Sequence, residues 1–414
     1  MGRLGPAAGD RYHSRMSETL DILILGAGLV GSSLACALEG RGYRCALVEA
    51  SPVASPPPGF DERKLALAAA SLNALRALDV SPRLATPPFP IRRLHVSRAG
   101  DFGVVRLQAG DYGREAFGGV VLARELGAAL ESRMATLRDT RTIRPARVVA
   151  VRNGDEAVEV EIERDGTTTA LRARLLVAAD GTRSFAREAL GIGTQEHDYG
   201  QTLVVCSVGC ERAPDGTAYE RFTGQGPVAL LPMGAHYGGI CGVDRADAPR
   251  VLALDDAAFA DYLQQRFGWR AGRILRVGKR SAYPIVRVLA DRLVAPRAVL
   301  LGNAAQTIHP IGAQGFNLGL RDALTLAECL DADVDPGSES LLAGYAAKRR
   351  EDRGRTLAFS DGLARLSAND SGTMRLLRSI GLTFLGNVPD LGAPLVSGAM
   401  GYRGEVPALA RGGA

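Results

Sequence analysis

The glycine pattern close to the N-terminus constrains the fold of this chain more than any other segment. Residues 20–25 (Leu-Asp-Ile-Leu-Ile-Leu) are almost all apolar, as in a strand that is buried on both faces. Gly26, Gly28 and Gly31 follow with the spacing Gly-x-Gly-x-x-Gly, and a helical stretch over 32–39 comes next. This order predicts a strand, a tight turn and a helix at the beginning of an α/β unit.

Each part of this pattern suits the binding of a dinucleotide. The first glycine permits the turn, the second lets the backbone approach a pyrophosphate, and the third lets the helix pack closely on the strand. The helix N-terminus offers free N–H groups to the phosphates. A second apolar strand over 45–48 ends in Glu49, eighteen residues after Gly31, where an acidic side chain receives ribose hydroxyls. The segment therefore predicts an ADP-binding unit.

Composition excludes several classes of protein. The basic residues are scattered, with no run of five or six, so a nucleic-acid-binding surface is not indicated. The six cysteines form no Cys-x-x-Cys pair and the five histidines are dispersed, so we expect no metal site. Free buried thiols are typical of a reducing cytoplasm. At 414 residues the chain is long enough for two or more packed subdomains.

Between residues 60 and 300 the pattern predicts a mixture of helices and strands. We expect helices over 61–78, 124–138 and 255–267, and strand pairs over 91–107 and 148–174. Residues 201–244 contain four or five short β-like runs without a helix between them. That run predicts an antiparallel sheet, inserted between parts of a discontinuous nucleotide-binding domain.

Two later segments repeat the arrangement of strand, turn and helix. One apolar run ends in Asp180, and another leads into the segment 302–322. In the second, Gln314 to Asn317 is expected to begin a helix whose free N–H groups could stabilise negative charge on a reduced flavin. Each motif alone is also typical of any tight strand–helix turn, but three in this order indicate a cofactor gripped at several points. A lone histidine beside a proline, such as His309, is as often structural as functional.

Four segments together resemble the flavoprotein aromatic hydroxylases of the para-hydroxybenzoate hydroxylase type, and within them the ubiquinone-biosynthesis hydroxylases. They are 26–49, Phe60-Asp-Glu-Arg63 with the Leu-Ala-Leu that follows, 180–187 and 302–322. The resemblance extends from about Leu20 to Arg411, and its last segment is very specific. Residues 60–80 and the Ala-Gln-Thr-Ile-His-Pro core are most similar to the 2-octaprenyl-6-methoxyphenol hydroxylase branch.

The resemblance implies an α/β fold with a Rossmann-like, discontinuous FAD-binding domain. A mainly antiparallel β substrate domain is inserted in it, and a C-terminal helical segment follows. We expect a disordered extension over 1–17, the FAD-binding domain over 18–90, 115–195 and 290–350, the sheet domain over 91–114 and 196–289, and the helical region over 351–414.

The resemblance also implies an FAD-dependent monooxygenase that hydroxylates a polyprenylated phenol in ubiquinone biosynthesis through a flavin C4a-hydroperoxide. The reductant is NAD(P)H or another electron donor, and O2 is the co-substrate. When the motifs of the family are matched to this sequence, the resemblance implies the following cofactor-binding residues: Gly26, Gly28, Gly31, Glu49, Arg63, Arg124, Asp180, Gly302, Asn303, Gly315, Phe316 and Asn317. The candidate catalytic residues are His309, Pro310 and Gln314.

Two positions depart from the family pattern. Asn303 stands where many flavin hydroxylases have an aspartate, although an amide still forms hydrogen bonds. The ubiquinone branch usually reads Ala-Gly-Gln-Gly after His-Pro-Ile, whereas this chain has Gly312-Ala313 before Gln-Gly. If Ala313 requires a positive φ, the alanine strains the loop by about 1 kcal/mol.

Alternatives remain open at this stage. The chain could hydroxylate a small soluble phenol or salicylate, or serve as a non-catalytic flavin-binding subunit of a quinone-synthesis complex. A flavin halogenase is disfavoured, because the single tryptophan is Trp269 and that group has a Trp-x-Trp-x-Ile-Pro motif. Residues 374–385 combine apolar side chains with Arg375 and Arg378, and either pack on the core or contact a membrane or partner. We expect a cytoplasmic protein, and peripheral contact at the inner face of the membrane stays open as an alternative.

Overall fold

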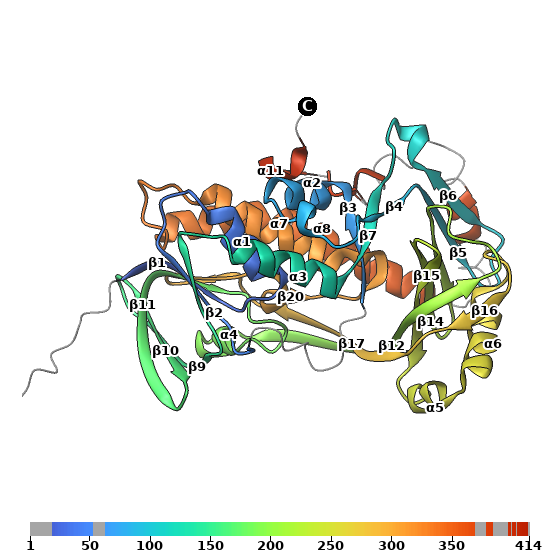
Figure 1. Cartoon of the computed structure of the whole chain (residues 1–414), viewed down its shortest axis with the longest axis horizontal. Coiled ribbons are helices and arrows are strands. Elements are labelled where there is room, and N and C mark those ends of the chain that lie inside the picture. Colours follow the sequence, from blue (N-terminus) through green and yellow to red (C-terminus); the bar gives the residue numbers. More distant parts are fainter. Residues whose placement is uncertain are drawn as a thin grey trace, which may run out of the picture.

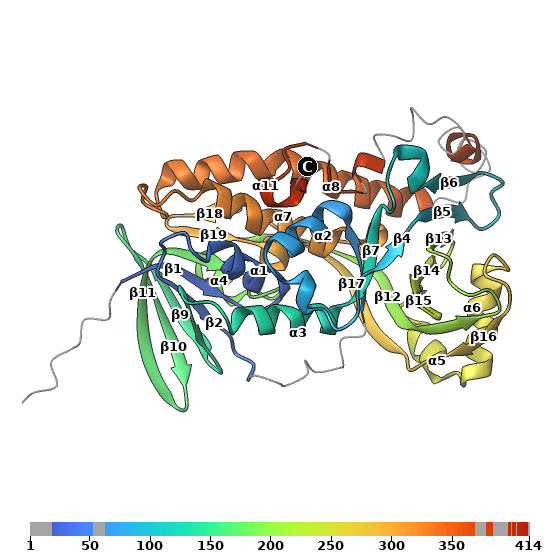
Figure 2. The ribbon, with the colours of Figure 1, turned by 45° about the horizontal axis from the view of Figure 1, so that its top comes forward.

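The chain folds into an elongated molecule with a sheet at each end and long helices along one side (Figure 1). The computed structural model describes residues 19–52, 63–368, 378–383, 396–398, 400–402 and 404–412. The extension expected over 1–17 lies outside the described residues. Figure 2 shows the same two sheets from another direction, with strands β12 and β17 running between the two ends.

The first sheet has a parallel core in the order β19-β11-β1-β2-β8. Its strands are β1 (Leu20–Leu25), β2 (Cys45–Val48), β8 (Thr140–Ile143), β11 (Thr167–Ala178) and β19 (Ala298–Leu300), with antiparallel additions β9 (Arg147–Asn153), β10 (Val158–Arg164) and β18 (Val294–Ala295). Because β1 is covered on both faces, Ile22, Leu23 and Ile24 are wholly buried.

Helices lie against these parallel strands, and the first of them forms the connection between the parallel strands β1 and β2. They are α1 (Leu29–Leu38), α3 (Ala123–Met134), α4 (Phe185–Ala189), α7 (Gln314–Cys329) and α8 (Glu339–Ala368). Helix α1 contacts both α3 and α7, and α7 contacts α8. The expected strands at 20–25 and 45–48 and the expected helix after the glycine turn are confirmed, although that helix begins at Leu29.

The helix expected over 61–78 was wrong in its first part. Residues 64–68 form a strand, β3 (Lys64–Ala68), which pairs with β7 (Gly118–Leu122) beside β4 (Phe89–Ile91). A helix, α2 (Ala69–Ala77), begins only afterwards. A Cβ on Gly118 would lie 2.0 Å from the Leu67 carbonyl oxygen, so this close pairing depends on a distant glycine. Tertiary pairing here overrides the helical propensity of alanine and leucine.

The second sheet is mainly antiparallel, with the order β20-β17-β12-β15-β14-β13-β5-β6, and β16 pairs with β12. Its strands are β5 (Arg93–Arg98), β6 (Val104–Gln108), β12 (Thr194–Cys210), β13 (Thr217–Thr223), β14 (Gly226–Met233), β15 (His236–Asp244), β16 (Ile274–Val277), β17 (Ser281–Ala290) and β20 (Gln306–Thr307). Helices α5 (Ala248–Ala253) and α6 (Asp256–Phe267) lie beside it, and Phe259 and Phe267 pack into its core. The antiparallel sheet expected over 201–244 is confirmed, and with it the fold class.

Only part of the C-terminal region belongs to the described residues. Within the amphipathic segment 374–385, residues 378–383 are helical, and Arg378 Nε contacts the buried Asp101 Oδ2 at 2.6 Å. This arginine therefore anchors the segment on the β5–β6 loop. The last helix, α11 (Ala408–Arg411), contacts α2. None of the helices formed by described residues is long and apolar enough to cross a membrane.

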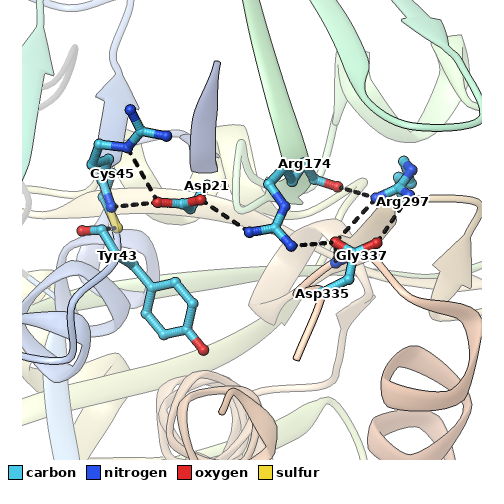
Figure 3. A network of polar contacts seen from close by, with 8 residues as sticks. Asp21, Tyr43, Cys45, Arg174, Arg297, Asp335 and Gly337 are labelled. Carbon is cyan, nitrogen blue, oxygen red and sulfur yellow. Dashed lines mark hydrogen bonds and ion pairs between the residues drawn. The ribbon is translucent and has the colours of Figure 1, made fainter. Parts of the chain in front are cut away.

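A polar network ties together the amino ends of the parallel strands (Figure 3). Arg174 of β11 donates to Asp21 of β1 at 3.2 Å and contacts Asp335, before α8, at 3.3 Å. Arg297, in the β18–β19 turn, contacts the other oxygen of Asp335 at 2.9 Å. These partly exposed pairs fix the sheet edge opposite the motif turns, and each contributes little stability alone.

Candidate functional site

The three motif turns lie side by side at the carboxyl edge of the parallel sheet. Gly26 follows β1, Asp180 follows β11 and Gly302 follows β19, and these strands are neighbours. A Cβ on Gly26 would lie 2.5 Å from the carbonyl oxygen of Ala179, so the first two turns are in close contact. The crevice outside such strand ends is where open α/β sheets bind their ligands.

The glycines of the first turn have different structural roles. Gly26 has a φ of +100°, which favours glycine. A Cβ on Gly31 would lie 2.0 Å from the Gly26 carbonyl oxygen, so Gly31 allows the helix to approach the strand. A Cβ on Gly28 would meet no protein atom within 4 Å. Gly28 therefore borders open space at the N-terminus of α1, which no side chain caps.

Glu49 closes the first turn from the end of β2. One carboxylate oxygen accepts a hydrogen bond from the N–H of Ala27 and the other from the N–H of Ser51, each at 2.8 Å. Each oxygen retains a further lone pair for a ribose hydroxyl. The acidic residue predicted from spacing is thus held at the glycine turn.

Asp180 and Arg187 connect the second turn to the third. The Asp180 carboxylate accepts from Ser184 Oγ at 2.5 Å and from the N–H of Ala186 at 3.0 Å, at the beginning of α4. Arg187, which is buried, donates through Nη1 to the carbonyl oxygen of Ala304 at 2.9 Å. These two contacts of Asp180 therefore hold the turn itself.

The third turn is anchored by a buried carboxylate. Gly302 has a φ of +55°, and its N–H donates to Asp322 Oδ2 at 3.2 Å. Gln306 Nε2 donates to the same oxygen at 2.6 Å, and Arg349 Nε donates to Oδ1 at 2.8 Å. Asn303 is exposed on this turn.

Arg349 also connects Asp322 to a second ion pair, which Arg321 and Asp352 form. Its Nη1 donates to Asp352 Oδ2 at 2.7 Å, and Arg321 Nε donates to the same oxygen at 2.8 Å. Burial alone would raise the pKa of Asp352, but Arg321 and Arg349 hold it below its ordinary value. We call Asp322, Arg349, Asp352 and Arg321 the buried arginine–aspartate cluster. It joins α7 and α8 behind the third turn.

A cavity of about 390 Å³ lies between the loop at 310–314 and the second sheet. Its sheet side is mostly apolar, and the side chains there include Leu94, Val96, Val105, Leu107, Phe222 and Leu231. Pro310 and Gln314 line the opposite side. This size and apolar lining are typical of pockets that enclose a small organic molecule.

The loop at 310–314 carries two consecutive residues with positive φ. Gly312 has a φ of +70° and Ala313 a φ of +52° with ψ of +36°. The condition set out for Ala313 from the sequence is therefore met, and a side chain occupies a left-handed backbone position there. Helix α7 begins directly after it without a side-chain cap.

Replacing Ala313 with glycine should raise the free energy of unfolding by about 1 kcal/mol or slightly less. Glycine adopts the left-handed conformation without strain, while its greater freedom in the unfolded chain offsets part of the gain. Urea denaturation of the cofactor-free protein measures the change. Ala135→Gly is the control, because Ala135 is exposed and has a φ of −62°. This substitution should lower the free energy of unfolding by up to about 1 kcal/mol. A loss of stability at both positions would contradict strain at Ala313.

His309 supports this loop from behind. Its Nδ1 accepts from the N–H of Ile311 at 3.2 Å, and its ring meets the Tyr199 ring edge-on at 4.7 Å. Burial lowers the pKa of His309 to about 4, although Asp361 acts in the opposite direction. The imidazole is therefore neutral at physiological pH. His309 is not among the described residues that line the cavity, and the catalytic roles of His309, Pro310 and Gln314 stay predictions.

Asn317 fixes the beginning of α7 to the β3–α2 junction. Its side-chain oxygen accepts from the N–H of Ala68 and from Ser71 Oγ, and its Nδ2 donates to the carbonyl oxygens of Ala66 and Ala313. Its side chain is thus fully engaged in the protein. Neighbouring Gly315 differs, because a Cβ there would meet no protein atom within 4 Å.

The remaining predicted cofactor residues differ in their surroundings. Arg63 is exposed, with its guanidinium 5.9 Å from the centre of the Tyr283 ring. Arg124 is exposed near the beginning of α3, and Phe316 packs against the core that surrounds the parallel sheet. The open positions at Gly28 and Gly315, the uncapped N-termini of α1 and α7, and the Glu49 carboxylate together fit an extended dinucleotide.

Sequence reasoning missed two features of the site. The buried arginine–aspartate cluster could not be identified, because its members come from separate helices. Glu220, which lines the cavity, left a recognisable signal. It alternates with Ala218 and Phe222 in a strand-like run, so a carboxyl falls on an otherwise apolar face.

Comparisons with known proteins agree with this geometry. Residues 19–360 match a family model described as an FAD binding domain. The chain is 36% identical to the ubiquinone hydroxylase UbiL of Rhodospirillum rubrum over 98% of this chain and 96% of that protein. It is 30% identical to the 3-demethoxyubiquinol 3-hydroxylase of Escherichia coli, over 88% of this chain and 94% of that protein.

The fold is also shared with solved structures. The p-nitrophenol 4-monooxygenase PnpA of Pseudomonas putida superposes with a TM-score of 0.77 at 18% identity, over 94% of this chain and 100% of that chain. CabE, an aromatic hydroxylase from angucycline biosynthesis, gives a TM-score of 0.69 at 23% identity, over 93% of this chain and 76% of that chain. Because both identities are below 25%, these two comparisons show a shared fold alone.

Proposed function

This chain belongs to the FAD-binding-domain family of flavin-dependent aromatic monooxygenases, and from that premise we propose that it hydroxylates a polyprenylated phenol in ubiquinone biosynthesis. The proposed substrate is 2-octaprenyl-6-methoxyphenol. The relatives named as ubiquinone-pathway hydroxylases support the pathway. The choice of substrate within it rests on the likeness of residues 60–80 and of the Ala-Gln-Thr-Ile-His-Pro core to one branch of the family.

The residues at the crevice suit FAD. When bound, FAD takes reducing equivalents from NAD(P)H or another donor and activates O2, so that one oxygen atom reaches an electron-rich ring. In our proposal Gly28 and the N-terminus of α1 accommodate the pyrophosphate, and Glu49 receives the adenosine ribose. The uncapped N-terminus of α7, with Gly315, supports the flavin ring. Asn303 contributes an amide from the third turn.

The apolar cavity beside the loop at 310–314 is the observation that carries the proposal. It gives a hydrophobic ring a water-poor position next to the turn assigned to the flavin, which excludes competing reactions with solvent. A polyprenyl substrate resides in the membrane, so the proposed function includes peripheral contact with the inner membrane face. Arg378 is engaged with Asp101, and that contact must therefore use other residues.

Expression in an Escherichia coli strain that lacks 2-octaprenyl-6-methoxyphenol hydroxylase tests the proposal. We expect the wild-type chain to restore ubiquinone in the quinone pool, measured by mass spectrometry. Gly28→Ala, a variant expected to fold but to bind FAD about 10-fold to 100-fold more weakly, should restore less ubiquinone than the wild-type chain.

Other outcomes identify the alternatives. If the unhydroxylated intermediate accumulates while the protein is flavin-loaded, a strain lacking 3-demethoxyubiquinol 3-hydroxylase tests the second ring position. Restored ubiquinone in that second strain would assign the hydroxylation to the second ring position. Without rescue in either strain, oxygen uptake that depends on small phenols would indicate a soluble-phenol hydroxylase. Retained FAD without any uptake would indicate a non-catalytic subunit.

A further inference from the structure

One acidic side chain lies on the sheet face of the cavity. Along β13, Ala218, Glu220 and Phe222 all line the cavity, as alternate residues of a strand share a face. Arg221 instead reaches toward α6, where its Nε donates to the carbonyl oxygen of Arg266 at 3.1 Å. Glu220 therefore presents a carboxyl group to the space proposed for the phenol.

The surroundings of Glu220 are mostly apolar. Its direct neighbours on the adjacent strands are Val96 and Ala229, which also line the cavity. Burial raises the pKa of Glu220 to about 7, partly opposed by the backbone N–H of Gly312 in the loop opposite. The side chain is only partly exposed because its open side is the cavity itself.

The other ionisable groups of the cavity are already engaged or differ in chemistry. Arg321 and Asp352 belong to the buried arginine–aspartate cluster, and Arg355 pairs with Glu351 at 2.6 Å. Tyr219 is a phenol whose pKa is raised by burial and, to a smaller extent, by Asp215. Among the described residues, no arginine or lysine forms an ion pair with Glu220. The carboxylate thus has capacity to accept a hydrogen bond from a ligand.

We propose that Glu220 accepts the proton of the substrate's phenolic hydroxyl as the ring is hydroxylated, an inference that rests on the proposed function. The O–H bond breaks, its electron pair stays on the ring oxygen, and the proton moves to the Glu220 carboxylate. In the same step the ring carbon forms its bond to one oxygen atom of O2, and the other oxygen atom leaves as water with the two electrons supplied by NAD(P)H. The ring carbon releases its C–H proton to solvent as aromaticity returns, and Glu220 returns its proton to the ring oxygen.

The proton transfer accompanies ring attack and does not precede it. A phenol has a pKa of about 10, well above that of Glu220, so full ionisation before attack is unfavourable. A positioned general base of this kind contributes about 100-fold to 10,000-fold in rate. Because only the ionised carboxylate can act, turnover should rise with pH through about 7, the value expected for Glu220.

Binding of 2-methoxyphenol provides a readout independent of turnover. Its affinity for the FAD-loaded wild-type protein, measured from the change in the flavin absorption spectrum, should increase about tenfold as pH rises through 7, because hydrogen bonds to charged groups are the stronger ones. In Glu220→Gln we expect affinity that does not change with pH, and turnover reduced by about 100-fold or more. Glu220→Asp should recover part of both pH responses.

The matched control is Glu163→Gln, because Glu163 lies on β10 of the first sheet and pairs with Arg147 at the surface. It should behave as wild type. If Glu220→Gln keeps the wild-type pH response while wild type hydroxylates phenols, the role of Glu220 is wrong and the proposed function stands. If Glu220→Gln does not fold, a flat pH dependence of wild-type binding still overturns the role. A wild-type protein that neither binds nor hydroxylates any phenol removes both proposals.

Discussion

Replacing Gly28 with alanine should weaken FAD binding by about 10-fold to 100-fold, because overpacking at a close contact costs about 1–3 kcal/mol and each 1.4 kcal/mol is a factor of ten. The backbone at Gly28 has a φ of −67°, which alanine adopts without strain. The added methyl group meets no protein atom within 4 Å, so the cofactor-free protein should unfold at an unchanged temperature. Titration of the apoprotein with FAD, followed by flavin fluorescence, measures the affinity.

Gly31→Ala is the matched comparison for this experiment. Its methyl group would lie 2.0 Å from the Gly26 carbonyl oxygen, so the helix must move away from the strand. We expect this variant to lose about 3 kcal/mol or more of stability without any cofactor present. Wild-type FAD affinity in Gly28→Ala would show that the pyrophosphate does not approach this turn.

Replacing Arg349 with methionine should lower the free energy of unfolding by about 3–5 kcal/mol, the usual cost of removing one partner from a buried ion pair. The Arg349 side chain is 2% exposed, and Asp322, at 4%, would keep its charge without the arginine. Asp352 would still have Arg321. Urea denaturation at a fixed FAD concentration measures the change, since bound ligand adds to apparent stability.

Two further variants separate the charge effect from lost packing. Adding Asp322→Asn to Arg349→Met removes the unpaired charge and should restore part of the stability. Arg147→Met breaks only the exposed pair with Glu163 and should change stability by less than about 1 kcal/mol. Equal losses at Arg349 and Arg147 would contradict the anchoring of the third turn by the cluster.

Local sequence signals predicted the parts of the site that depend on nearby residues. Gly26 and Gly31 act within one turn and one helix, so their spacing alone indicated the geometry. The strain at Ala313 could be predicted for the case that this residue has a positive φ, because the φ that a tight loop requires depends on a few consecutive residues. These features follow from steric limits on a few consecutive residues.

Long-range pairing explains what the sequence did not predict. Residues 64–68 became a strand because Gly118, some fifty residues later, allows a close partner. The cluster around Asp322 requires Arg349 from another helix, which no local periodicity reveals. Glu220 was visible as a carboxyl on an apolar face, but its function depends on the loop that faces it, and only the fold brings Gly312 there.

The two longest strands of the second sheet determine how the molecule can move. β12 and β17 form a ladder from the pair Thr194 and Ala290, close to the first sheet, to the pair Val205 and Ser281 at the far end, with a bulge between Asp198 and Gln201. Hinge closure, as in proteins whose halves are joined by flexible linkers, would have to break this ladder. We therefore expect the two ends of the molecule to rotate little against each other, so that the cavity between the loop at 310–314 and the second sheet keeps nearly the same dimensions when a substrate binds.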